Sequence, residues 1–242
     1  MKTLYIIGNG FDLFHELPTS YASFNAYANE IGSDFEEHFR FSINDEALWQ
    51  DFETDLATFD SNNFFDLYNE IDIQRENFKY SEIYGLEDQL EQESTGVAEG
   101  IQELFFEWLA SIDFSVKPLL SSFIDSDYFL NFNYSPLLQE TYAVNPNNIL
   151  HIHGSIHQGY VEFGHGYAIP EEPIFDEDGN SLTHPLSNAE GHATIALALL
   201  KKPVEDIIDT NKDFFEHVSK FTQIVVLGHS LSDVDIPYFQ LI

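Results

Sequence analysis

Four short polar segments hold the residue types that could do chemistry, and each follows a stretch that predicts a β-strand. They are Gly8 to Asp12, Asn131 to Ser135, His151 to Ser155 and Gly228 to Asp235. In open α/β sheets, ligands bind in the crevice beyond the carboxyl ends of the strands. We therefore expect these four segments, far apart in the sequence, to meet in one pocket.

The first segment, Gly8-Asn9-Gly10-Phe11-Asp12, has the features of a phosphate-binding loop. Its glycines permit positive φ and a close approach of backbone to a pyrophosphate, and the helix that follows would offer free N–H donors. The pattern is not GxGxxG, because His15 and Glu16 stand where more glycine is expected. A simple turn after a strand is the alternative interpretation.

Asn133 and His153 are the predicted catalytic pair. A neutral imidazole can accept a proton or stabilise a developing cation near pH 7. An asparagine amide can hold a ribose hydroxyl or position a water without adding charge. Taken singly, an Asn after a strand is commonly a turn former, and a His before a glycine, here Gly154, is commonly structural.

The last segment, Gly228-His229-Ser230-Leu231-Ser232-Asp233-Val234-Asp235, follows a strong apolar run. We expect it to close over the adenosine half of a dinucleotide through the Ser230 hydroxyl and backbone contacts. The alternative is an ordinary strand-to-helix turn in which Ser232 or Asp233 caps the helix.

Histidines also raise a metal-site hypothesis, in which His151, His153, His157 and His165 bind an ion with Glu162 or a nearby Asp. A His-x-His pair on a strand would place both rings on one face. The spacing does not match a helical HExxH site, and the chain has zero cysteines and therefore no thiolate ligands. We expect no metal.

The charge balance is extreme, with 9 basic and 42 acidic residues and a net charge of −33. Such a surface repels phosphate backbones and argues against nucleic-acid binding. It favours a solvated acidic surface over a decoy for a basic partner. An anionic ligand would have to be held by backbone N–H groups, because basic side chains are scarce.

Composition predicts a folded, cytoplasmic protein. Hydrophobic residues make up 43% of the 242 residues and aromatic residues 15%, which is ample for a core. No apolar run is long enough for a membrane span, and the opening residues 1–7 are too short for a signal peptide. We expect no membrane association.

Patterning predicts an α/β fold with a doubly wound, Rossmann-like parallel sheet. The expected strands are 3–7, 128–132, 149–153, 160–163 and a buried strand at 223–227; the expected helices are about 19–31, capped by Thr19 or Ser20, then 137–142 and 189–220 with a break at Pro203. We expect a loop at 168–188.

Residues 33–122 have a different character, with helical spacing of apolar residues at 48–53, 64–68 and 101–109. The acidic stretch 82–100 is predicted to be partly loop. We therefore expect a nucleotide-binding core made of 1–32 and 123–242, and a large helical insertion or cap at 33–122.

Several of these motifs, in this order, resemble the AbiH family of bacterial phage-abortive-infection proteins. The matching residues are 4–12, 17–21, 49–53, 132–134, 151–154 and 228–235, so the resemblance runs from residue 3 to about 239. The family in turn is similar to the sirtuin-like NAD-binding fold.

The sirtuin-like resemblance implies NAD as ligand or substrate. Gly8, Gly10, Gly154, Gly228 and Ser230 match its glycine and serine positions. By this resemblance Asn133 positions the nicotinamide ribose or water, and His153 acts as base on a ribose hydroxyl. The implied cofactor-binding set is completed by Asn9, Phe11, Asp12, Ser20, His229 and Asp235.

The resemblance implies an antiphage effector that hydrolyses NAD to nicotinamide and ADP-ribose, an NAD glycohydrolase. Ser135 stands where sirtuin deacylases carry an acidic residue, and the four-cysteine zinc module is missing, which disfavours deacylation. The alternative is a nucleotide-sensing or partner-binding module without turnover. The apolar ending Leu241-Ile242 predicts cover from a protein partner or a second copy.

Overall fold

A computed structural model of the protein describes residues 2–32, 38, 52–121, 123–169, 175 and 180–242. Four strands form a parallel sheet in the order β3-β2-β1-β6. Their bounds are β1 Thr3–Ile7, β2 Tyr128–Asn131, β3 Ile149–His151 and β6 Gln223–Leu227. The chain is therefore an α/β protein with a four-stranded parallel sheet, and all four main strands match predicted ones.

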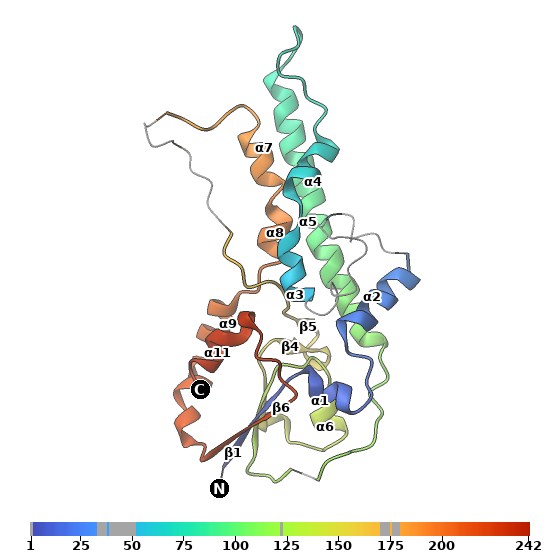
Figure 1. Ribbon diagram of the computed structural model, residues 1–242, viewed down its shortest axis with the longest axis vertical. Helices are drawn as coiled ribbons and strands as arrows, with labels where there is room; N and C mark the ends of the chain where they lie inside the picture. The colour runs from blue at the N-terminus through green and yellow to red at the C-terminus, as the bar shows by residue number, and fades with distance from the viewer. Residues whose placement is uncertain (1, 33–37, 39–51, 122, 170–174, 176–179) are drawn as a thin grey trace. The chain divides into compact units, whose positions relative to one another are not determined.

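The carboxyl ends of the four strands lie in one row. Ile7 pairs with Asn131 on one side and with Leu227 on the other, and Asn131 pairs with His151. Figure 1 shows β1 and β6 side by side although they come from opposite ends of the sequence. The four polar segments therefore all leave the sheet at one edge, as the sequence predicts.

Period-2 alternation directs side chains to the two faces of the sheet, and each face is covered by helices. Leu4, Ile6 and Leu130 form one core cluster with residues of the helices that flank β6. Those are α9 Val204–Thr210, α10 Lys212–Glu216, η6 Val218–Lys220 and α11 Ile236–Phe239. A 3₁₀ turn, η7 Asp233–Asp235, directly precedes α11. The expected break at Pro203 is confirmed, since α9 begins directly after it.

Ile7 and Phe129 belong to a second core cluster on the opposite face. Its helices are α1 Asn9–Phe14 and α6 Leu137–Glu140. In α2 Tyr21–Glu30, Ser20 is the N-cap and accepts a hydrogen bond from the Ser23 N–H at 3.1 Å. A 3₁₀ turn, η4 Pro146–Asn148, leads into β3.

A small antiparallel hairpin follows β3, made of β4 Gly154–Ser155 and β5 Tyr160–Val161 joined by η5 Ile156–Gln158. The strand predicted at 160–163 thus exists, but pairs with β4 and does not join the parallel sheet. The strand predicted at 149–153 ends at His151, because residues 152 and 153 form a turn.

Chain contacts divide the protein into two units. The first comprises Met1–Ser33, Leu104–Phe163 and Lys202–Ile242 and contains the sheet; the second comprises Asp34–Glu103 and Gly164–Lys201. This division differs from the predicted one in two places, because it assigns 104–122 to the sheet unit and 164–201 to the helical unit.

Helices make up most of the second unit. They are α3 Phe52–Asp55, η3 Leu56–Thr58, α4 Ser61–Tyr68, most of α5 Tyr80–Ser111, α7 Ser187–His192 and α8 Ile195–Leu199. Buried Ser94 of α5 accepts a hydrogen bond from the Ala196 N–H of α8 at 2.7 Å. The predicted helical residues 48–51 and most of the predicted loop 168–188 lie outside the described residues.

The prediction that 82–100 is partly loop is wrong, because α5 is a continuous helix of 32 residues. Its apolar side chains recur at helical spacing and are buried at Ile83, Leu86, Leu90, Ala98, Ile101, Leu104, Phe105 and Trp108. An added Cβ would meet no neighbouring atom within 4 Å at three of its glycines, Gly85, Gly96 and Gly100. They therefore lie on the uncovered side of the helix, where a missing side chain costs little packing.

The predicted strand at 223–227 is confirmed, but the prediction that it is buried is wrong. β6 is an edge strand, and its residues Ile224 and Val226 are 45% and 46% exposed. A run of β-branched residues reports strand propensity, but not the position of the strand in a sheet.

Among the described residues, no helix is long and apolar enough to cross a membrane.

We predict that Gly228→Ala destabilises the fold strongly. Gly228 has φ +70°, and an added Cβ would lie 2.2 Å from the backbone nitrogen of Phe11. Strain and clash together should lower the free energy of unfolding by about 3 kcal/mol, measured by urea denaturation.

Gly159→Ala is the matched control, since Gly159 has φ +78° with no atom within 4 Å of an added Cβ. It should cost only about 1 kcal/mol, the strain alone. Equal losses in the two variants would contradict a role for the close approach at Gly228.

Candidate functional site

Three glycines allow the loop after β1 to pack directly against the loop after β6. An added Cβ would lie 2.5 Å from the Cα of His229 at Gly8 and 2.8 Å from the Cα of Gly228 at Gly10. The N–H of Gly8 donates to the Leu227 carbonyl at 3.0 Å, and that of Gly10 donates to the Gly228 carbonyl at 2.8 Å. These two N–H groups therefore join the loops to each other.

The other predicted residues of the first loop also have internal partners. The Asn9 amide donates to the Thr19 carbonyl at 2.8 Å and accepts from the Thr19 hydroxyl at 2.7 Å. Phe11 is 3% exposed in the core beside α6. Ser20 caps α2, and so Asn9, Phe11 and Ser20 hold the local fold.

Asp12 differs from its neighbours, because it is a buried carboxylate with an unused oxygen. It is 2% exposed, and Asn133 is 5% exposed. Oδ1 of Asp12 and Nδ2 of Asn133 have no hydrogen-bond partner among the described residues. Buried polar atoms without partners are rare in folded proteins, and each calls for an explanation such as a bound ligand.

Burial raises the pKa of Asp12 from 3.8 to about 6, although interactions with the side chains of Ser135 and Asn133 oppose that rise. Asn133 is close enough to Asp12 to influence its charge, but Nδ2 makes no hydrogen bond of normal geometry. The first and second polar segments thus meet at Asp12, Asn133 and Ser135.

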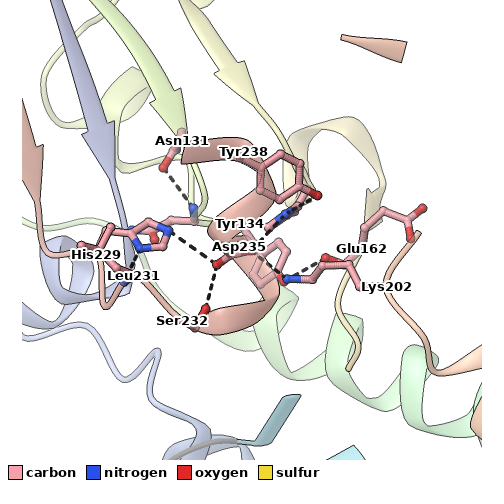
Figure 2. Close-up of polar contacts among 11 residues, drawn as sticks. Asn131, Tyr134, Glu162, Lys202, His229, Leu231, Ser232, Asp235 and Tyr238 are labelled. Carbon is pink, nitrogen blue, oxygen red and sulfur yellow. Dashed lines mark hydrogen bonds and ion pairs between the residues drawn. The ribbon is translucent and has the colours of Figure 1, made fainter. Parts of the chain in front are cut away.

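His151 fixes the segment that carries Asn133. Its Nδ1 lies 3.1 Å from the Asn133 carbonyl, and its Nε2 lies 2.7 Å from Nε2 of Gln139. The side chain of Asn131 accepts from the Asn133 N–H at 3.1 Å (Figure 2). Burial lowers the pKa of His151, so its imidazole is neutral at pH 7.

His153 belongs to a second polar group, centred on Asp235. Nε2 of His153 lies 3.3 Å from the Tyr238 hydroxyl and 3.7 Å from Oδ1 of Asp235. Burial, and then the charges of Lys202 and His229, hold the pKa of His153 well below its usual value. The imidazole is therefore neutral, and its approach to Asp235 is not an ion pair.

Asp235 joins the loop after β6 to the start of α9 (Figure 2). Nζ of Lys202 lies 3.4 Å from Oδ1, and the Ser232 hydroxyl donates to Oδ2 at 3.0 Å. His229 approaches Oδ2 at 3.6 Å, while burial lowers its pKa against the opposing effect of Asp235. Lys202 is thus the charge partner of Asp235 in a buried network.

The remaining predicted ligand residues lie in the same unit. Gly154 has φ +73°, and an added Cβ would lie 2.5 Å from the Tyr160 carbonyl, so it shapes the β4–β5 hairpin. Ser230 is exposed in the loop after β6.

The expectation that the His-x-His pair shares one face is wrong, because the strand ends at His151 and the two rings have different partners. His157 faces Glu140 at 3.0 Å, and His165, in the second unit, faces the Leu197 carbonyl at 2.9 Å. Within the part of the chain that is described, no group of three or more acidic, histidine or cysteine residues is arranged to hold a metal ion.

Lys202 and Tyr238 were missed by the sequence prediction. A signal for Lys202 exists, since it is one of only 9 basic residues and directly precedes Pro203 at the start of a helix. Nothing in the local pattern distinguishes Tyr238 from other apolar positions of α11.

We predict that Asp12→Asn makes the protein more stable at pH 8. A carboxyl whose folded pKa is raised favours the folded state below its unfolded value and opposes it once pH exceeds about 6. Removing the charge should raise the free energy of unfolding by roughly 3 kcal/mol at pH 8, and by little near pH 4. Urea denaturation at both pH values measures this.

Asp127→Asn is the control, since Asp127 is also buried but accepts a hydrogen bond from the Ile124 N–H at 2.9 Å. The free energy of unfolding of that variant should be lower by about 2 kcal/mol. A loss of stability in Asp12→Asn at pH 8 would show that its carboxylate has a stabilising partner.

We predict that Lys202 and Asp235 stabilise the fold only when both are present. Lys202→Met leaves a buried carboxylate without its cation and should cost about 3 kcal/mol. Adding Asp235→Asn should recover most of that loss in the same denaturation assay. An additive double variant would argue against coupling between the two charges.

Comparison with protein families matches residues 4–242 to the family described as bacteriophage abortive infection AbiH. Comparisons with curated proteins and with solved structures find no match. Because the family match covers almost the whole sequence, the chain belongs to the AbiH family of bacteriophage abortive infection proteins.

Proposed function

We propose that this AbiH protein is an antiphage effector that binds NAD and hydrolyses the bond between nicotinamide and ribose. The observation that carries the proposal is the pair of buried, unpartnered polar atoms on Asp12 and Asn133. They lie where polar segments leave a parallel sheet, the position at which open α/β sheets bind ligands. The proposal includes a doubly wound, sirtuin-like architecture for the core.

The two groups suit the chemistry of that bond. Cleavage produces a cationic, oxocarbenium-like sugar, which a nearby carboxylate stabilises in a water-poor site. Asp12 is ionised above about pH 6, and its Oδ1 makes no hydrogen bond of normal geometry with the described residues. The free amide nitrogen of Asn133 can donate to a ribose hydroxyl.

His153 and Ser230 complete the proposed site. The low pKa of His153 keeps its imidazole neutral, so that a ring nitrogen can accept a hydrogen bond from a ribose hydroxyl. The exposed Ser230 can contact the adenosine half. Since the N–H groups of Gly8 and Gly10 have partners, the pyrophosphate would depend on other backbone donors.

A second function, nucleotide sensing without turnover, is favoured by the position of His153. Its ring is 2% exposed, and Nε2 already faces Tyr238 and Asp235. An imidazole held in this way can have a purely structural role. Asn133 and Asp12 would then bind the ligand without it.

We predict that the purified protein releases nicotinamide from NAD, and that Asn133→Ala and His153→Ala each reduce release at least about 100-fold. Chromatography of nicotinamide and ADP-ribose measures it. Asn147→Ala, at an exposed site before β3, and His217→Ala, at an exposed site after α10, are matched controls that should retain full rates.

Calorimetric titration with NAD separates the two functions. Binding without release of nicotinamide would support sensing over hydrolysis. Absence of both binding and release would exclude both functions.

A further inference from the structure

The Asp12 carboxyl group is buried near the side chains of Asn133 and Ser135. It comes from α1, while Asn133 and Ser135 come from the segment after β2, and all three side chains are at least 95% buried. Ser135 and Asn133 both interact with the carboxyl group, yet Oδ1 has no hydrogen-bond partner among the described residues. Oδ1 of Asp12 and Nδ2 of Asn133 are therefore near each other, but neither makes a hydrogen bond of normal geometry with the described residues.

Other titratable side chains on the elements packed here face elsewhere. His15, directly after α1, faces the Phe11 carbonyl at 2.8 Å and the Tyr142 hydroxyl at 2.6 Å. His151 faces Gln139, while His153 and His229 both face Asp235. The chemistry of proton acceptance beside Asn133 thus falls to the carboxylate.

We propose that Asp12 is the general base of the reaction and accepts a proton from the water that attacks the ribose. The inference rests on the proposed NAD hydrolysis and assigns a role to one residue of that site. The sequence predicted Asp12 only as a ligand-binding residue.

The step balances in atoms and charge. The bond between C1′ of the ribose and the nicotinamide nitrogen breaks, and its electron pair leaves with neutral nicotinamide. The oxygen of water forms the new bond to C1′, and one water proton passes to the Asp12 carboxylate. That proton is then released to solvent, so that NAD and water give nicotinamide, ADP-ribose and one proton.

Burial makes the Asp12 carboxylate a stronger base than an exposed carboxylate. A base works best when its pKa lies near the working pH, and burial raises that of Asp12 to about 6. Turnover should therefore be full above pH 7 and fall as pH drops through 6, since only the ionised form accepts a proton.

Asp12→Asn tests the proposal in the full-length protein. We expect nicotinamide release at saturating NAD to fall by about 100-fold or more, with NAD affinity by calorimetry changed less than about threefold. The residual rate of the variant should not decrease below pH 6, whereas the rate of the unmodified protein should. Asp127→Asn removes a buried carboxylate just before β2, at the opposite end of that strand, and should leave rate and pH profile unchanged.

Each outcome separates the inference from the proposed function. Hydrolysis by the unmodified protein that persists in Asp12→Asn, or a profile that stays flat between pH 5 and 7, would overturn the inference and leave NAD hydrolysis standing. No hydrolysis by the unmodified protein would overturn the proposed function and the inference together. If Asp12→Asn fails to fold, the pH profile of the unmodified protein tests the inference by itself: a fall in rate below pH 6 supports it, and a flat profile overturns it.

Discussion

The close approach of two loops, one after β1 and one after β6, is the constraint on which the site depends. At Gly8, Gly10 and Gly228 the backbones come so close that no Cβ fits, and two N–H groups bridge the loops. β1 and β6 lie at the two ends of the sequence but are neighbours in the sheet. The glycines thus serve first to bring chain segments together, a requirement that explains their pattern even without a phosphate.

The polar residues at the carboxyl edge of the sheet fall into two groups with different contacts. In the first group, Asp12 of α1 lies near Asn133 of the segment after β2. In the second group, Asp235 contacts His153 and also Lys202, which lies just before α9. The first group has unpartnered atoms and the second is an internally connected network. The unpartnered atoms of Asp12 and Asn133 are the basis of the proposed ligand site.

Much of the fold could be predicted from the sequence, because strand propensity and helical spacing are local properties. The four main strands, the cap at Ser20 and the break at Pro203 were all predictable in this way. Local pattern failed for α5, where glycines and acidic residues lie on an uncovered side, and for β6, whose place at the edge depends on the order of strands. Asp12 and Asn133 could be chosen from sequence as site residues, but their shared burial and the Lys202–Asp235 pair depend on contacts between distant segments.

The burial of Lys202 has a consequence for how fast an anionic ligand can reach the protein. Only 9 basic residues oppose 42 acidic ones, and one of the 9 is enclosed beside Asp235. A dinucleotide, the proposed ligand, would diffuse toward the protein against a repulsive electrostatic potential, which slows encounter and is weakened by dissolved salt. Association of such a ligand should accelerate with ionic strength, the opposite of the behaviour of proteins that steer anions with lysine and arginine.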